Sequence, residues 1–207
     1  MKARKVKKLD PVDRLDGNAA RTILTRIDEL RSFAPAALEP GAEAAQHDMR
    51  IAAKRLRYLL EITAFCFGKP AARARKAARE LQEVLGEIHD CDVMLPRVRA
   101  QIDALRAEDV HAVLVRAGEA DDLDPGLVAR APNRTCYRGL ELLAVHLQAQ
   151  RALLFERFRE SWQAEASKGT WAKLVRNAEE VLAELSQEQA AASAARAAPT
   201  REKFPVS

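Results

Sequence analysis

The chain has 207 residues, of which 48% are hydrophobic and 31% are charged, and its net charge is +4. This composition excludes a disordered or fibrous chain, and the length suffices for one buried core. No apolar run approaches the roughly 18 residues of a membrane-spanning helix, and no apolar secretion signal follows the basic N-terminus. The three cysteines lack CxxC spacing, so we expect reduced thiols in a cytoplasmic protein without membrane contact.

The N-terminal part of the chain is predicted to be a short arm followed by a helix. Residues 1–14 are basic and are expected to form a flexible arm ahead of a helical domain at residues 15–185. Apolar residues at helical spacing predict the first helix at about residues 18–31. A loop is then predicted over residues 33–45, because this stretch contains a glycine and two prolines, the first of them Pro35.

The next two predicted helices are long, at about residues 44–67 and 71–88. Each has apolar residues three and four positions apart, which is the pattern of a helix that packs against a core. Gly68 and Pro70 stand where a C-cap and a helix stop are expected. Because the turn is short, the two helices are predicted to form an antiparallel hairpin. Tyr58 is predicted to be a core aromatic residue.

The rest of the chain also has helical periodicity. Further helices are predicted at about residues 93–107, 109–117, 133–162 and 171–185. Asp90 and Asp92 are expected to be caps or partners for nearby arginines, and Asp92 is well placed to N-cap the first of these helices. Residues 186–207 contain few large apolar side chains and are predicted to be a disordered tail. No segment has the alternation of a strand, so the predicted fold class is all-α, an antiparallel helical bundle built from long helical hairpins.

Positive charge is concentrated in one segment of the chain. From His47 to Arg79 there are nine Lys or Arg residues and two acidic residues. This is a net charge of +7, so the rest of the chain must sum to −3. On the predicted helix His47, Arg50, Lys54 and Arg57 are spaced by three or four residues, which places them on one face. Like charges stacked in this way repel each other, and the stripe therefore indicates an anionic ligand.

The helix that follows repeats this arrangement. Arg75, Arg79, Gln82, Gly86 and His89 are again spaced by three or four residues. A glycine inside a helix costs about 1 kcal/mol relative to alanine, and here it would let a ligand or a neighbouring backbone approach closely. In a hairpin the two stripes can converge on one groove. Guanidinium groups bind phosphate oxygens in pairs, and a row of cations suits a linear polyanion.

These residues resemble the CHAD family, the conserved histidine α-helical domains. The resemblance rests on two motifs, H-x-x-R-x-x-x-K-R-L-R-Y-x-x-E and L-Q-x-x-L-G-x-x-H-D-x-D-V. Their residues here are His47, Arg50, Lys54, Arg55, Leu56, Arg57, Tyr58 and Glu61, then Leu81, Gln82, Leu85, Gly86, His89, Asp90, Asp92 and Val93. Together the motifs are specific, and they cover about a quarter of the chain.

The resemblance implies a helical bundle that binds inorganic polyphosphate in a basic groove and associates with polyphosphate granules. The predicted polyphosphate-binding residues are His47, Arg50, Lys54, Arg55, Arg57, Arg75, Arg79, Gln82 and His89. Many members contain the hairpin motif twice, whereas this chain has one clear copy. Either a second chain in a homodimer completes the groove, or the second half supplies cations, for which the candidates are Arg134, Arg138, Arg151 and Arg157.

Three other interpretations stay open. The stripes could be solvated charged faces. The chain could be an HD-type metal phosphohydrolase built around His89 and Asp90, although the neighbouring cations would repel a divalent metal ion. It could also bind nucleic acid, which is less favoured because no row of aromatic residues is available for stacking bases. The E-x-E-x-K motif of the triphosphate-tunnel domain in some relatives is missing, so we predict a non-catalytic protein without cofactor or metal.

Overall fold

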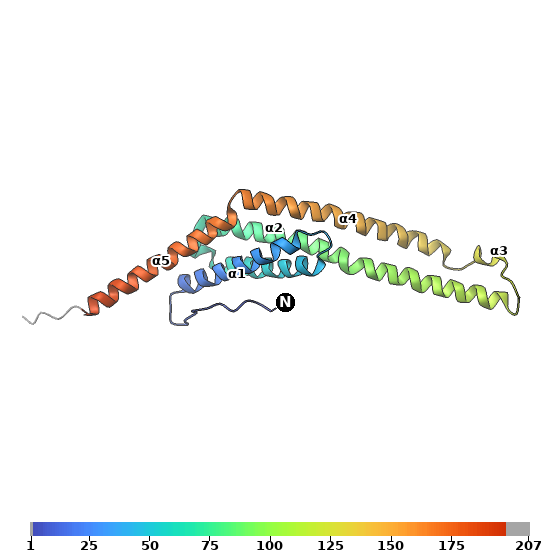
Figure 1. Cartoon of the computed structure of the whole chain (residues 1–207), viewed down its shortest axis with the longest axis horizontal. Coiled ribbons are helices and arrows are strands. Elements are labelled where there is room, and N and C mark those ends of the chain that lie inside the picture. Colours follow the sequence, from blue (N-terminus) through green and yellow to red (C-terminus); the bar gives the residue numbers. More distant parts are fainter. Residues whose placement is uncertain (1, 198–207) are drawn as a thin grey trace, which may run out of the picture. The chain divides into compact units, whose positions relative to one another are not determined.

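The structure is a computed structural model that describes residues 2–197. Within this range it consists of helices and loops without a strand, so the predicted all-α helical bundle is confirmed. The helices follow one another along the chain as α1 (Leu15–Ala37), α2 (Glu43–Ala117), α3 (Pro125–Val128), α4 (Arg134–Ser167) and α5 (Thr170–Ala197), as labelled in Figure 1.

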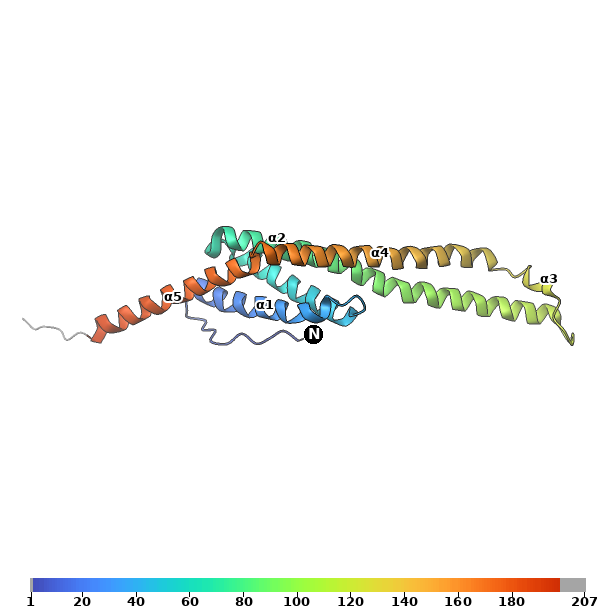
Figure 2. The same ribbon diagram turned by 45° about the horizontal axis from the view of Figure 1, so that its top comes forward.

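Helix α2 is a hairpin of two arms, residues 43–67 and residues 69–117. Gly68 separates them with φ 58° and ψ −139°, which are not helical angles. A positive φ is accessible to glycine because it has no Cβ. The predicted turn at Gly68 is therefore confirmed, and Figure 2 shows the chain reversing there.

The described residues form two compact units. The first contains residues 2–32, 51–79 and 164–197, and the second contains residues 33–50 and 80–163. The first unit has a buried core from α1, both arms of α2 and α5, which includes Ile23, Ile27, Leu30, Leu56, Leu60, Trp171 and Leu174. The second unit buries Met49, Leu81, Leu85, Ile88, Leu154 and Phe158.

The loop predicted at residues 33–45 is shorter than expected. Helix α1 continues through Pro35 to Ala37, and only five residues separate α1 from α2. Pro35 removes one helical hydrogen bond, but the neighbouring Ala34 and Ala37 are buried. The Gln46 side-chain amide also donates to the Ala37 carbonyl at 3.2 Å, which satisfies an acceptor at the end of the helix.

The helices predicted at 93–107 and 109–117 are not separate elements. The second arm of α2 runs without interruption to Ala117, so of the two roles expected for Asp92 the N-cap is wrong and the arginine partner is confirmed. The stretch around residue 92 lacks glycine, and the Asp92 carboxylate binds the Arg151 guanidinium at 2.5 Å instead of a backbone N–H group.

The two chain ends also differ from the predictions. Helix α5 continues to Ala197, well beyond residue 185, while the rest of the predicted tail, residues 198–207, lies outside the described residues. Residues 186–194 are all exposed, so this alanine-rich extension owes its helix to propensity and not to packing.

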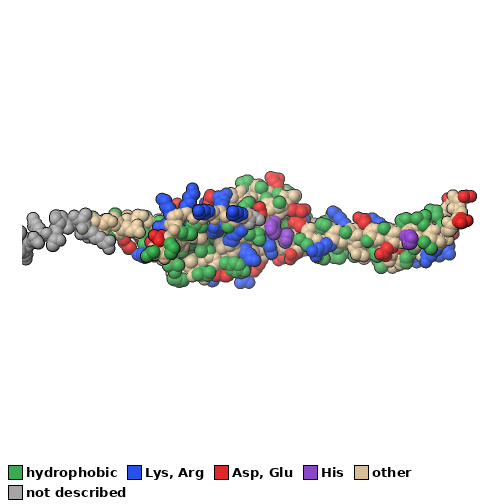
Figure 3. Space-filling model, turned by 90° about the horizontal axis from the view of Figure 1, so that it is seen from below, with side chains coloured by type: hydrophobic (Ala, Val, Ile, Leu, Met, Phe, Trp, Pro, Cys, Tyr) green, Lys and Arg blue, Asp and Glu red, His purple; other side chains and the backbone are tan. Residues whose placement is uncertain are grey.

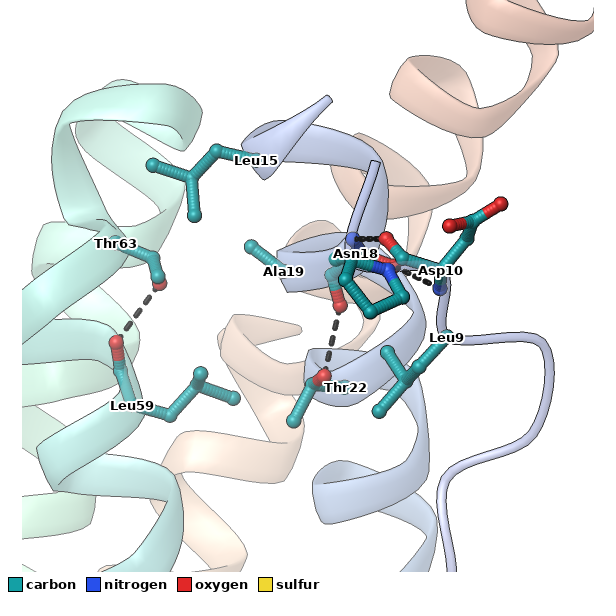
Figure 4. A pocket seen from close by; sticks show the side chains of 9 residues that line it. Leu9, Asp10, Leu15, Asn18, Ala19, Thr22, Leu59 and Thr63 are labelled. Carbon is teal, nitrogen blue, oxygen red and sulfur yellow. Dashed lines mark hydrogen bonds between the residues drawn. The ribbon is translucent and has the colours of Figure 1, made fainter. Parts of the chain in front are cut away.

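Residues 2–14 are not helical, but they contact α1. The Arg4 backbone N–H donates to Glu29 at 3.1 Å, and Asp10 exchanges hydrogen bonds with the Asn18 side chain. The arm closes one side of a mainly apolar hollow of about 440 Å³ beside Leu59 and Thr63 (Figure 4).

Candidate anion-binding site

Two histidines lie against each other between the arms of α2 in the second unit. The His47 and His89 ring centroids are 4.7 Å apart, with 48° between the ring planes, and both side chains are partly buried. Each histidine is 21 residues from Gly68. The antiparallel arms therefore bring together the two motif histidines, as the sequence predicted. Figure 3 shows a face on which histidine side chains (purple) adjoin one another and lysine and arginine side chains (blue) are numerous.

Gly86 makes room for the guanidinium of Arg50. These residues are both 18 positions from Gly68, and a Cβ atom on Gly86 would lie 3.4 Å from Arg50 Nε. This distance is at the lower limit of ordinary van der Waals contact, so the guanidinium packs closely against the glycine. The prediction named a ligand or a neighbouring backbone at Gly86, whereas the structure places a cationic side chain of the opposite arm there.

Three polar atoms of this cluster are buried without a hydrogen-bond partner among the described residues. They are His47 Nδ1, Arg50 Nε and Gln82 Oε1. Leaving a buried polar group unsatisfied costs about 1–3 kcal/mol, and rotation of the Gln82 amide would present a donor in place of the oxygen. All three atoms belong to residues that the sequence predicted as ligand contacts.

A second group of the predicted cations belongs to the first unit. Lys54, Arg75 and Arg79 are exposed, whereas Arg57 is partly buried and forms an ion pair with Glu61 at 3.2 Å. These residues add positive charge along both arms of the hairpin.

Tyr58 is not a core residue, contrary to the prediction. It is 45% exposed. The Arg57 guanidinium carbon lies 4.6 Å from its ring centroid and the Lys54 ammonium lies 5.9 Å away. These are cation–π distances, and the exposed ring therefore helps to hold two cations in place.

Arg55 has a different environment from the other motif cations. Its guanidinium binds Glu29 at 3.2 Å, and Glu29, which is only 1% exposed, also binds the Arg26 side chain and the Arg4 backbone N–H. A buried carboxylate needs such partners. We therefore assign Arg55 to the internal structure of the first unit.

Arg151 of α4 also has internal partners. Besides Asp92, it donates to the Pro40 carbonyl at 2.7 Å and to Gln46 Oε1 at 2.9 Å. Gln46 was not singled out by the sequence analysis, although it directly precedes the first motif and is almost fully buried. These contacts hold α4 against the hairpin within the second unit.

The three other second-half candidates lie elsewhere on α4. The Arg134 guanidinium donates to the Ala129 carbonyl next to α3. Arg138 and Arg157 are exposed.

The described residues contain no group of three or more His, Cys, Asp or Glu side chains that could hold a metal ion. Within residues 2–197, no helix is both long and apolar enough to cross a bilayer.

Comparison with known families bears out the resemblance. The family model of the CHAD domain matches residues 3–99 of this chain, a range that includes both motifs, the histidine pair and Gly86. No curated protein and no solved structure matches the chain.

Proposed function

This chain carries a CHAD domain, and we propose that it binds inorganic polyphosphate without hydrolysing it. The observation that carries the proposal is the set of unpartnered buried atoms on His47, Arg50 and Gln82, next to His89. Phosphate oxygens are acceptors that can satisfy the Arg50 donor and the N–H donors of the imidazoles.

The repeated cations favour a polymer over a single phosphate ion. The first unit alone has four of the predicted cations, Lys54, Arg57, Arg75 and Arg79. A small anion would use few of these charges, whereas a linear polyanion offers one negative charge or more for every repeat. Binding of this kind would hold the protein at polyphosphate granules.

The HD-type hydrolase is the less favoured alternative. Such an enzyme needs carboxylates beside its histidines to bind a divalent metal ion. Asp92, the second acid of the H-D-x-D motif, is instead bound by Arg151. Orthophosphate release from polyphosphate with Mg²⁺ or Mn²⁺, abolished in His89→Ala, would contradict the non-catalytic proposal.

The binding proposal is tested by titrating the protein with polyphosphates of defined length. Arg50→Gln should weaken binding roughly ten- to hundredfold, since a charge-assisted contact contributes about 1.5–3 kcal/mol. Arg97→Gln is the matched control, because it removes one exposed charge from the same helix, and it should change affinity little. Affinity should fall steeply with added salt, and less steeply for Arg50→Gln.

Two outcomes would refute this assignment. Equal losses in Arg50→Gln and Arg97→Gln would mean that net charge alone determines binding. Equal or tighter binding of single-stranded RNA, at the same phosphate concentration, would favour the nucleic-acid alternative. Thermal unfolding of each variant separates lost binding from lost structure, and His89→Gln provides a second site variant.

A further inference from the structure

Helix α4 has exposed apolar residues at regular helical spacing, although a helix face that contacts only water is usually polar. They belong to a stripe, which we call the α4 stripe, whose positions are spaced by four, three, four, three and four residues and are all exposed: Arg138, Leu142, Val145, Ala149, Ala152 and Glu156. Leu142 is 64% exposed and Val145 is 63% exposed. Spacing of this kind is typical of a helix that pairs with another helix.

The α4 stripe is distinct from the face of α4 that packs inside the second unit. That inner face includes Leu154 and Phe158, which are buried, and Arg151, which binds Asp92 of α2. At 100° per residue, the inner face lies on roughly the opposite side of the helix from the stripe. Helix α4, which lies beside the second arm of α2 in Figure 1, therefore has two apolar faces, of which one is uncovered.

Two copies of the α4 stripe are complementary in charge and in apolar residues when they run antiparallel. Its six positions form three pairs centred on residue 147: Val145 with Ala149, Leu142 with Ala152, and Arg138 with Glu156. An antiparallel pair of α4 helices would thus have an apolar centre and opposite charges at both ends. Parallel pairing would place like charges together at each end, which is unfavourable.

The flank of the stripe fits the same register. Gly139 is exposed inside α4, and a Cβ atom there would have no neighbour within 4 Å. Leu153 is 59% exposed, and antiparallel pairing centred near residue 147 would bring it against Gly139 of the opposite helix. A glycine inside a helix lowers its stability. Because Gly139 has no Cβ, it would leave room for the Leu153 side chain of the opposite helix.

We propose that α4 is a homodimer interface, in which the α4 stripe of one chain packs antiparallel on the α4 stripe of a second copy. The ion pair between Glu156 and Arg159 at 2.7 Å does not prevent this, since it is exposed on both sides and such pairs contribute little. Only about five helical turns are in contact, so the dimer dissociates on dilution.

The mass of the full chain in solution, measured by light scattering and sedimentation equilibrium over a range of concentrations, tests the proposal. We expect twice the 22.9 kDa of one chain at high concentration, and one chain after dilution. Leu142→Glu with Val145→Glu should abolish the dimer with unchanged helical content. Ile62→Glu with Phe65→Glu, which alters two still more exposed apolar residues of the first unit, should leave the dimer intact.

Charge exchange tests the antiparallel register. Arg138→Glu alone and Glu156→Arg alone should each weaken the dimer at least several-fold, since each places like charges together. The double exchange should restore it. A monomer at every concentration, a dimer that survives Leu142→Glu with Val145→Glu, or failure of the double exchange to restore association would overturn the proposal.

Discussion

Arg50 and Arg55 belong to the same motif, but their side chains differ in the partners that the rest of the folded chain provides. The Arg50 Nε atom is buried without a partner among the described residues, while the Arg55 guanidinium binds the buried Glu29 carboxylate. The sequence analysis assigned Arg50 to the ligand from its spacing and Arg55 from the family motif. The difference comes from the residues that face them, because Glu29 of α1 is distant in the sequence and its position is set by packing.

Arg55→Gln should therefore act on stability. Removing one partner of a buried carboxylate costs about 3–5 kcal/mol in the general case, and Arg26 remains to limit the loss here. We expect a clear decrease in the free energy of unfolding, measured by urea denaturation. Arg50→Gln should not show it, and equal destabilisation by the two variants would contradict their separate roles.

Because of Tyr137, the stability of the second unit should depend on pH in the alkaline range. Burial raises the pKa of its phenol, and the hydrogen bond to the Asp109 carboxylate raises it further, to about 12. The folded state thus holds this proton more tightly than the unfolded state, whose pKa is close to 10. The resulting stability is present below pH 10 and is lost between about pH 10 and 12.

Asp109→Asn should lower the pKa of Tyr137 towards 10, because it removes the negative charge that opposes the phenolate. Ultraviolet absorbance of the phenolate against pH measures this directly. A Tyr58→Phe background leaves Tyr137 as the remaining tyrosine. An unchanged titration would show that burial alone determines the shift.

Helix positions were easier to predict than helix ends. The core stripe of the first arm of α2 and the turn at Gly68 follow from apolar spacing and from glycine chemistry, and both are confirmed. The boundary errors at Pro35 and Asp92 have one cause. Each residue has a local preference that tertiary contacts override, the burial of Ala37 in one case and the Arg151 ion pair in the other.

Arg151 should be the residue on which the α2–α4 contact depends most. Arg151→Ala leaves the Asp92 carboxylate and Gln46 Oε1 without their donor, and we expect a loss on the order of 3 kcal/mol in unfolding free energy. The matched control is Arg157→Ala on the same helix, which is exposed. If the two variants are equally stable, the buried network does not contribute.

At the scale of the whole molecule, the chain has a family-matched region and a region without a match. The match ends at residue 99, within the second arm of α2. The candidate site up to His89 could be predicted from motifs because helical spacing and one turn determine which side chains meet. The second apolar face of α4 could not, because the spacing that predicts an inner face with Leu154 and Phe158 does not show that another apolar stripe on the same helix is exposed.

The C-terminal extension should be dispensable for folding. Residues 186–194 are exposed, and Glu188 forms an exposed ion pair with Arg14 of the N-terminal arm. A chain that ends after Leu185 should unfold within about 1 kcal/mol of the full chain, since exposed ion pairs contribute little. Calorimetry of both forms measures this, and a large loss would show that the extension packs.

His47 and His89 are the same number of residues from Gly68, and so are Arg50 and Gly86. The hairpin should therefore not tolerate a change in the length of one arm. One residue inserted between Gly68 and Gly86 would rotate everything beyond it by about 100° and carry His89 away from His47. Four inserted residues would nearly restore the direction but shift the second arm by about 6 Å, so that His47 would face a different turn. We therefore expect evolution and engineering to vary length freely in residues 118–124, and to leave the distance between the two histidines fixed.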